Sequence, residues 1–252
     1  MKTLQFLILV LILELFTGMM HASCQDVNAI LEKMDEIFYS PKDKQGKVAI
    51  ILTDKAGKEK VREAEMFQKG RDKKLYRYTK PESQAGMATL ALPNDVMWLY
   101  MPAYETPKKI SRLAKNQSFT GTDFSYEDMA TSAYSDRYIP DSLETEKDMY
   151  IMRLLPRSSN SAYSKIIIRI NKTYGYPISM KYYNVMGKKF KEANYRYEKI
   201  GEYWNAAEVV MKDLEKNHST KIRLWDMKFD QGLTDDIFTV EKLKPSEAKK
   251  KN

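Results

Sequence analysis

The side chains most often used for nucleophilic and metal chemistry are almost missing from this sequence. Its 252 residues include two histidines, His21 and His218, and one cysteine, Cys24. These residues cannot form a Cys₂His₂ or His₃ zinc site, and an intrachain disulfide needs a second cysteine. A Ser-His-Asp triad would have to use His218, and a Cys–His pair would have to join His218 to Cys24. The composition argues against most hydrolases, and we expect no catalytic residue, no metal and no cofactor.

The first 24 residues have the pattern of a secretory signal. Lys2 precedes the apolar run LQFLILVLILELF, which is interrupted only by Gln5 and Glu14. The run of about 13 residues is too short to span a hydrocarbon core of roughly 30 Å, and small residues follow it, as signal cleavage sites require. We therefore expect residues 1–24 to be a signal peptide and the protein to be exported to the periplasm or cell envelope.

Two fates are open for Cys24. Ala22 and Ser23 before it are similar to a bacterial lipobox, in which the cysteine becomes the lipidated first residue, although His21 stands where such motifs usually have leucine. Alternatively, cleavage after Cys24 leaves Gln25 as the first residue. The choice separates a lipid-anchored protein from an unanchored envelope protein.

The positive charge is spread along the chain. The formal net charge of +8 does not change when residues 1–24 are removed, because Lys2 and Glu14 leave together. A nucleic-acid-binding protein would concentrate its basic residues on one patch, but here most lie beside acidic ones. The densest cluster, Lys249–Lys251, falls in residues 245–252, which we expect to be a flexible tail. We predict no nucleic-acid partner and, at most, peripheral contact with anionic headgroups.

The expected elements are one helix followed by many strands. Residues 26–38 form the helix, with apolar side chains on one face and Asp26 as its cap. Alternation predicts antiparallel strands over the following ranges: 47–53, 59–68, 73–80, 87–92, 96–103, 108–114, 147–156, 164–171, 178–184, 188–200, 203–214 and 219–229. Residues 115–142 break this pattern and contain a second, short helix. We find no linker, so residues 25–252 are predicted to form one domain.

The predicted sheet is large compared with its covering helices. A sheet of this many strands must curl, and two helices are too small to cover all of its inward side chains. Closure into a barrel or half-barrel with a partly unfilled apolar interior solves this problem, and such interiors hold hydrophobic ligands. The alternative is a fully packed core. Candidate cavity-lining residues are Trp98, Tyr100, Ile166, Ile168, Met180 and Tyr182.

One segment is a candidate motif. It is GTDFSYEDM, formed by Gly121, Thr122, Asp123, Phe124, Ser125, Tyr126, Glu127, Asp128 and Met129. Ser125 and Asp128 have the spacing of a capping box, and the acidic side chains suit the positive end of a short helix. Phe124 and Met129 can pack the turn onto the sheet. The segment is therefore either a structural staple or a lid over a ligand. His218 lies in a separate Asn-His-Ser turn, and we expect it to be exposed.

The motif carries a family resemblance. GTDFSYEDM, together with the preceding W-x-Y-x-P strand formed by Trp98, Tyr100 and Pro102, resembles the hallmark of the LolA/LolB-like outer-membrane lipoprotein-sorting family. The resemblance covers the whole mature chain. It implies a mainly β fold with flanking helices (α+β), in which a curved antiparallel sheet forms an unclosed barrel lidded by helices. It also implies an apolar concave side that binds an acyl chain or another lipid.

Two functions follow from these observations. The first is a non-enzymatic envelope carrier that shields a lipoprotein acyl chain or a lipid inside a half-barrel and takes part in sorting to the outer membrane; its partners would be lipoproteins or an inner-membrane transporter. The second is an envelope sensor or adaptor that binds lipid or peptide and assists a membrane transport or signalling complex. A hydrolase is disfavoured by the single histidine of the mature chain.

The first prediction concerns metal ions. Because His218 is the only histidine after residue 24, we expect a chelator to leave the melting temperature unchanged. Differential scanning fluorimetry with and without EDTA checks this, and a fall of several degrees would contradict it.

Overall fold

The computed structural model describes residues 27–111, 114 and 116–245. The predicted signal segment, Cys24, the capping residue Asp26 and residues 246–252 of the predicted tail lie outside this part of the chain.

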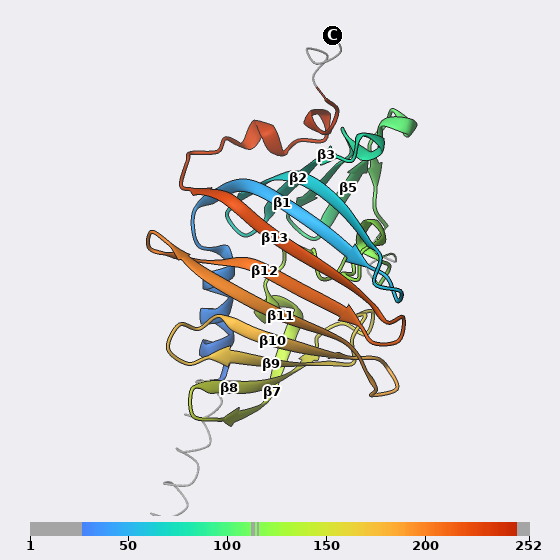
Figure 1. Cartoon of the computed structure of the whole chain (residues 1–252). Helices are drawn as coiled ribbons and strands as arrows, with labels where there is room; N and C mark the ends of the chain where they lie inside the picture. Colours follow the sequence, from blue (N-terminus) through green and yellow to red (C-terminus); the bar gives the residue numbers. More distant parts are fainter. Residues whose placement is uncertain (1–26, 112–113, 115, 246–252) are drawn as a thin grey trace, which may run out of the picture.

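Thirteen antiparallel strands form one sheet that is not closed, with β6 and β7 at its two edges. The order across the sheet is β6-β5-β4-β3-β2-β1-β13-β12-β11-β10-β9-β8-β7 (Figure 1). The strands are β1 (Asp43–Thr53), β2 (Glu59–Lys69), β3 (Lys73–Lys80), β4 (Ala88–Leu92), β5 (Val96–Tyr100), β6 (Lys108–Lys109), β7 (Tyr138–Thr145), β8 (Met149–Pro156), β9 (Lys165–Asn171), β10 (Pro177–Tyr183), β11 (Lys189–Ile200), β12 (Tyr203–Asp213) and β13 (His218–Phe229).

The order of the strands forces a long crossing. The chain begins at the centre of the sheet with β1 and proceeds neighbour by neighbour to the edge strand β6. It then starts again at the opposite edge with β7 and returns to the centre, where β13 pairs with β1. Residues 110–137 therefore have to pass from one edge of the sheet to the other.

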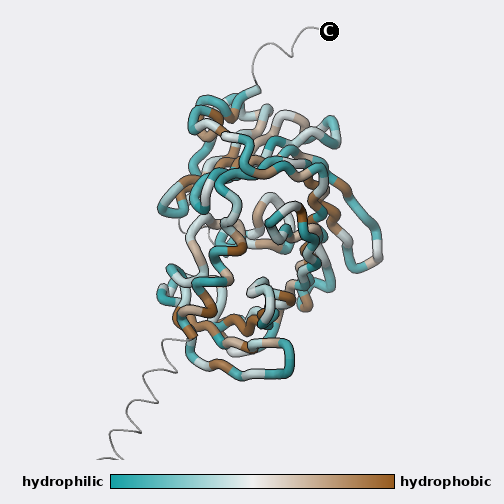
Figure 2. Tube along the Cα trace, turned by 90° about the vertical axis from the view of Figure 1, so that its left-hand side faces the viewer, coloured by the Kyte–Doolittle hydropathy of each residue, from teal (hydrophilic) through white to brown (hydrophobic). Residues whose placement is uncertain are grey.

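This crossing segment and the first helix cover the concave face. The helix runs through residues 27–39 and places Leu31 and Met34 in the core with exposed fractions of 1% and 0%. Ile166, Ile168 and Met180 of the sheet belong to the same buried cluster. Figure 2 shows the trace of the sheet curving around the shorter segments inside it. The helical face predicted from the sequence is thus confirmed.

The described residues of the crossing segment contain little regular structure. They include η4 (Phe119–Gly121), a short 3₁₀ helix, and α2 (Tyr134–Arg137), a single helical turn that ends at β7. Asp35 of the first helix holds the start of α2, because its two carboxylate oxygens accept hydrogen bonds from the backbone N–H groups of Tyr134 and Ser135, both at 2.9 Å. The polar anchor explains the burial of Asp35, which is 5% exposed.

The chain end covers the convex face over β3–β5. There the chain end forms η5 (Asp235–Phe238) and η6 (Glu241–Leu243), which lie above the upper strands in Figure 1. Phe238 and Leu243 pack into one buried cluster with Leu75 and Leu90 of the sheet. Two further 3₁₀ turns, η1 (Glu82–Gln84) and η2 (Pro102–Tyr104), flank β4 and β5.

The predicted sheet is confirmed, with two differences. The pairing of β1 with β2 across the Asp54–Gly57 turn is as expected, and Ile166, Ile168 and Ile170 share the buried face. Strand β7 was not predicted, because its sequence contains Pro140 and alternates weakly. Proline is tolerated on an edge strand, and β7 is the edge. Of the expected strand over 108–114, the described part is a strand at Lys108–Lys109 only.

The second prediction tests the C-terminal cover. Phe238 is 3% exposed inside the cluster on the convex face, so Phe238→Ala leaves a cavity and should lower the free energy of unfolding by about 3 kcal/mol. Val185, which is 84% exposed, supplies the matched control, because Val185→Ala should change it by less than about 0.5 kcal/mol. Urea denaturation measures both, and equal effects would contradict the proposed cover.

Candidate functional site

A cavity lies between the concave face and the segments that cover it. Its volume is about 190 Å³. The end of the first helix contributes Phe38 and Tyr39, and the crossing segment contributes Phe124, Met129 and Tyr134. The sheet contributes the remaining wall, with apolar side chains that include Tyr182, Tyr195, Val209, Ile222 and Leu224. Every strand side chain in this list points to the same face of the sheet because side chains alternate along a strand.

A second hollow borders the same face further along. Its volume is about 430 Å³. Met87, Leu99 and Met101 form an apolar wall, and Thr120 of the crossing segment lies at its edge. Both hollows adjoin one buried cluster built on Val48, Ile50, Leu52, Ala64 and Met66, against which lining residues from each of them pack.

The stretch Phe119–Phe124, called the strap below, begins with η4 and borders both hollows. Thr120 lines one hollow and Phe124 lines the other. Arg62 Nη1 donates a hydrogen bond of 2.6 Å to the carbonyl oxygen of Thr120, and the Tyr78 hydroxyl lies 3.3 Å from Thr120 Oγ1. Thr120 has φ of 47°, a conformation that β-branched residues rarely adopt. The strap is therefore held in a strained turn by a few polar contacts.

Asp123 anchors the strap to the centre of the sheet. Its Oδ2 accepts a hydrogen bond of 2.6 Å from Thr220 Oγ1 and lies 2.7 Å from His218 Nδ1. Lys191 Nζ donates to the carbonyl oxygen of Asp123 at 2.7 Å. The expectation that His218 is exposed was wrong: its side chain is 25% exposed because it packs against the strap to meet Asp123.

Glu127 anchors the next turn to the far half of the sheet. The Tyr138 and Ser161 hydroxyls each donate a hydrogen bond of 2.7 Å to its Oε1. The backbone N–H of Ala162 donates to Oε2 at 2.7 Å. Glu127 is 6% exposed, and these three donors replace the water that a buried carboxylate loses.

Ser125 and Asp128 form the reciprocal hydrogen bonds that their spacing predicts. Asp128 Oδ2 accepts from the backbone N–H of Ser125 at 2.7 Å, and the backbone N–H of Asp128 donates to Ser125 Oγ at 3.1 Å. Tyr163 Oη also donates to Asp128 Oδ2 at 2.7 Å. Burial raises the pKa of Asp128, although these hydrogen bonds and Lys191 act against the shift. The expected helix is only a turn over residues 126–129.

The remaining motif residues complete the turn. Phe124 is 7% exposed and belongs to the main core, as predicted for a packing residue. Thr122 is buried and its hydroxyl donates to the carbonyl oxygen of Phe119 at 2.7 Å. Tyr126 packs edge-on against Phe119, and Gly121 takes a φ of 79° that glycine adopts without steric penalty. In this structure the motif packs onto the sheet and also walls the cavity.

Three cations reach the cavity between the helix and the strap: Lys44, Lys74 and Arg137. Lys44 Nζ donates a hydrogen bond of 3.3 Å to the carbonyl oxygen of Phe38, and Lys74 Nζ lies 5.7 Å from the centre of the Tyr39 ring. Arg137 Nη1 donates to the carbonyl oxygen of Glu127 at 2.8 Å. None of the three forms an ion pair within the described residues.

Burial changes the titration of the two lysines. It lowers the pKa of Lys44 to about 8. Burial, and then the positive charges of Lys44 and Arg137, lower the pKa of Lys74 to about 7. Removal from water disfavours the charged form of an amine, so the cavity holds two lysines that titrate near neutral pH. Both are half-buried, and the accessible part of each borders the cavity.

A series of aromatic rings runs from the cavity to the rim of the sheet. Inside the cavity, the Phe38 and Tyr195 rings have centres 6.3 Å apart. Tyr195 stacks on Tyr197 at 6.3 Å, and Tyr197 stacks on Tyr176 at 4.1 Å. Tyr176 meets Trp204 at 5.1 Å. The hydroxyl of Tyr197 is buried without a hydrogen-bond partner.

The six residues expected to line a cavity fall into three groups. Tyr182 lines the cavity. Ile166, Ile168 and Met180 lie on the same face, but each is at most 1% exposed and belongs to the packed core beneath the helix.

Trp98 and Tyr100 do not line the cavity. They point to the convex face, where they pack with the chain end. Alternation along β5 instead turns Leu99 toward the second hollow.

Sequence reasoning missed the three cations. Lys74, Tyr76 and Tyr78 are spaced by two residues along one strand, so their side chains share a face of the sheet. This spacing could have indicated that Lys74 faces the interior. Lys44 precedes the apolar run of β1, and Arg137 lies in a turn; their convergence depends on the pairing of distant segments.

The described residues contain neither a candidate metal site nor a helix that could span a membrane. No group of three or more His, Cys, Asp or Glu side chains is arranged to hold a metal ion in this part of the chain. Between residues 27 and 245, where the chain is described, no helix has the length and apolar character needed to cross a membrane.

Comparison with known proteins places the fold in a known group. A family model described as "-like: Uncharacterized protein" matches residues 70–245. None of the curated proteins matches the chain.

Three solved structures are similar over most of the chain. An outer membrane lipoprotein-sorting protein domain from Vibrio parahaemolyticus has a TM-score of 0.81 and 23% identity, covering 88% of this chain and 100% of that one. A DUF1329 family protein from Desulfovibrio piger has a TM-score of 0.80 and 22% identity, covering 88% and 99%. A LolA superfamily protein from Nitrosomonas europaea has a TM-score of 0.70 and 25% identity, covering 84% and 96%.

The third prediction distinguishes a lid from a core staple. Ser125→Ala removes the two hydrogen bonds between the Ser125 hydroxyl and Asp128, keeps the one from the backbone N–H, and should lower stability by about 1 kcal/mol. Phe124→Ala removes a buried ring and should lower it by about 3 kcal/mol. If residues 116–137 open as a lid, both changes should speed amide hydrogen exchange mainly within this segment, because a lid opens at lower free energy than the whole fold.

Hydrogen exchange with mass spectrometry provides the measurement. Ser158→Ala, at an exposed serine outside the segment, should leave the exchange pattern unchanged. Faster exchange spread over the strands in the Ser125 and Phe124 variants would show that the segment is a core staple.

Proposed function

The chain belongs to the family matched by residues 70–245 and has the fold of LolA-like, lipoprotein-sorting proteins; from that premise we propose that it carries a hydrophobic ligand. The ligand is an acyl chain of a lipoprotein or a free lipid, held on the concave side of the open sheet. The protein acts in the cell envelope, as a carrier and not as an enzyme, and contributes to sorting toward the outer membrane.

The division of one apolar face into two hollows supports this proposal most directly. The cavity of about 190 Å³ is smaller than the roughly 300–1,000 Å³ of ordinary ligand sites, whereas the second hollow reaches about 430 Å³. The strap lines both hollows, and its Thr120 contacts Tyr78 of the shared apolar cluster. Displacement of the strap would join the two hollows into one apolar trough that could receive an acyl chain.

The strap is held in a way that suits reversible opening. Its anchors are the Asp123 contacts with Thr220 and His218 and the Arg62 hydrogen bond to Thr120. These polar groups can exchange their partners for water when the strap lifts, whereas the buried rings of Phe119 and Phe124 would have to be covered again by the bound ligand. Strain at Thr120 further reduces the free energy difference between closed and open states. We infer that a ligand exchanges through this movement within residues 116–137, which end where β7 begins.

The alternative role as a sensor or adaptor predicts a different behaviour. A carrier has to release its ligand to a second membrane, whereas a sensor needs only to bind it. Transfer of a fluorescent fatty-acyl lipid between two vesicle populations therefore separates the two roles, since a sensor would bind the lipid without accelerating its transfer.

The fourth prediction concerns binding to the concave face. We expect the mature protein to bind a fluorescent acyl ligand saturably and to accelerate its transfer between vesicles. Met101→Glu should weaken binding at least about tenfold, because it places a charge on the apolar wall of the second hollow. Ile168 is unsuitable for this test, since it is 0% exposed and a charge there would disrupt the core.

The matched control is Ile139→Glu, which places the same charge on an edge strand where the side chain is 46% exposed. It should leave binding unchanged. Circular dichroism spectra verify that both variants are folded. Absence of saturable binding by the wild-type protein to any acyl ligand would overturn the carrier proposal, as would equal weakening by both variants.

A further inference from the structure

We propose that the ligand of the cavity is an anionic amphiphile whose acidic head group is bound by Lys44, Lys74 and Arg137. This inference rests on the proposed function and narrows it, because it assigns the ligand a charge and an orientation. A carboxylate and a phosphate monoester share the required chemistry, namely an oxyanion that accepts several hydrogen bonds.

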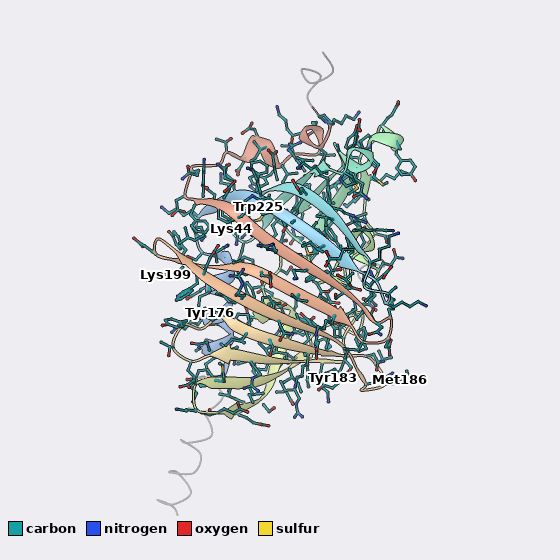
Figure 3. All side chains as sticks on the ribbon, viewed as in Figure 1. Lys44, Tyr176, Tyr183, Met186, Lys199 and Trp225 are labelled. Carbon is teal, nitrogen blue, oxygen red and sulfur yellow. The ribbon has the colours of Figure 1, made fainter. Side chains whose placement is uncertain are left out.

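The three cations come from distant parts of the chain and meet on one wall. Lys44 begins β1, Lys74 lies near the start of β3, and Arg137 ends α2. Figure 3 labels Lys44 near the first residues of β1, at the end of the strand that faces the helix. All three side chains border the same cavity. Lys44 and Arg137 are close enough to act on the charge of Lys74.

The protein itself leaves donors of this cluster unused. Arg137 Nε is buried and has no hydrogen-bond partner, although the guanidinium is fixed by Glu127 and by stacking 4.8 Å from the Tyr134 ring centre. Each lysine ammonium has three donors, and within the part of the chain that the structure describes the one hydrogen bond from these two groups goes to the Phe38 carbonyl oxygen. A bound oxyanion would satisfy these donors at once and offset the repulsion between the three charges.

Neighbouring acidic groups do not already neutralise the cluster. Asp128 borders the cavity, but its oxygens accept hydrogen bonds from Ser125 and Tyr163, and burial raises its pKa. Asp35 is engaged by the start of α2. Glu127 acts on the charge of Arg137, but its carboxylate already accepts three hydrogen bonds.

The tyrosines facing the cluster remain neutral, because burial raises the pKa of Tyr39, Tyr76 and Tyr134 well above the ordinary range. Among the described residues that border the cavity, the three cations therefore offer unused hydrogen-bond donors to a ligand.

Aromatic side chains beyond the cations form a surface for the apolar part of the ligand. From the cations the cavity wall passes to Phe38 and Tyr195, and the stacked rings of Tyr197 and Tyr176 continue it to the rim. The ligand would thus lie with its head beside the three cations and its chain either along these rings or under the strap toward the second hollow. A polar head without a chain would leave this surface uncovered.

The experiment compares ligands that share a chain and differ in the head group. The mature protein is titrated with dodecanoate, dodecyl phosphate and methyl dodecanoate at about pH 6, where both lysines are charged. We expect each anion to bind at least about tenfold more tightly than the ester. The double variant Lys44→Met, Lys74→Met should lose most of this preference while it still binds the ester, and Lys74→Arg should keep it. The control Lys181→Met changes an exposed lysine and should bind like the wild type.

The pH dependence gives a second measurement. Raising the pH to about 9 neutralises the two lysines while Arg137 stays charged, so the preference for dodecanoate should decrease in the wild type and change little in the double variant. Thermal melts verify folding; the double variant should melt no lower than the wild type, since it removes two buried charges that have no ion-pair partner.

The outcomes separate the two proposals. Equal binding of anions and ester by the wild type overturns this inference and leaves the carrier function standing. An anion preference that survives in the double variant also overturns it. If neither anions nor ester bind, the carrier function fails together with it. Preference for only one of the two anions supports it and identifies the head group as a carboxylate or a phosphate.

Discussion

The crossing of residues 110–137 from one edge of the sheet to the other is the constraint on which the rest of the structure depends. Both halves of the sheet meet at its centre, where β1 pairs with β13, so the chain must traverse the concave face between β6 and β7. A segment that crosses an apolar concave face needs hydrogen-bond partners for its own backbone N–H and C=O groups there. The crossing therefore fills the interior and, at the same time, defines the hollows that remain.

The anchors of this segment explain the acidic motif. Asp123, Glu127 and Asp128 each meet a different part of the sheet, through Thr220, Tyr138 and Tyr163 respectively. Carboxylates suit this task because they accept several hydrogen bonds at once and keep them short. The groups that meet them are hydroxyls, the His218 ring and backbone N–H groups, so polar contacts fix the position of the cover. The buried rings of Phe119 and Phe124 add apolar contacts that a ligand would have to replace when the cover opens.

The same interior combines two chemical characters. Apolar side chains on the sheet and the helix make the concave face suitable for hydrocarbon, whereas Lys44, Lys74 and Arg137 form a positive wall at one end of the cavity. Burial of unpaired cations is unfavourable for folding, which is why their convergence is informative. A sheet that only needed to bury its apolar surface would gain nothing from them. The aromatic rings between this wall and the rim connect the polar end of the cavity with the exterior.

The sequence by itself determined the local structure and the fold class. Alternation placed Ile166, Ile168 and Ile170 on one face, the Ser125–Asp128 spacing predicted reciprocal hydrogen bonds, and the helix face was read from its period; each depends only on neighbours in the chain. Tertiary structure alone decided which face of β5 would meet the cavity, so Trp98 and Tyr100 turned out to lie under the chain end. It also brought His218 to Asp123 and Lys44 to Lys74 and Arg137, because contacts between residues distant in sequence follow from strand order, which local periodicity does not encode.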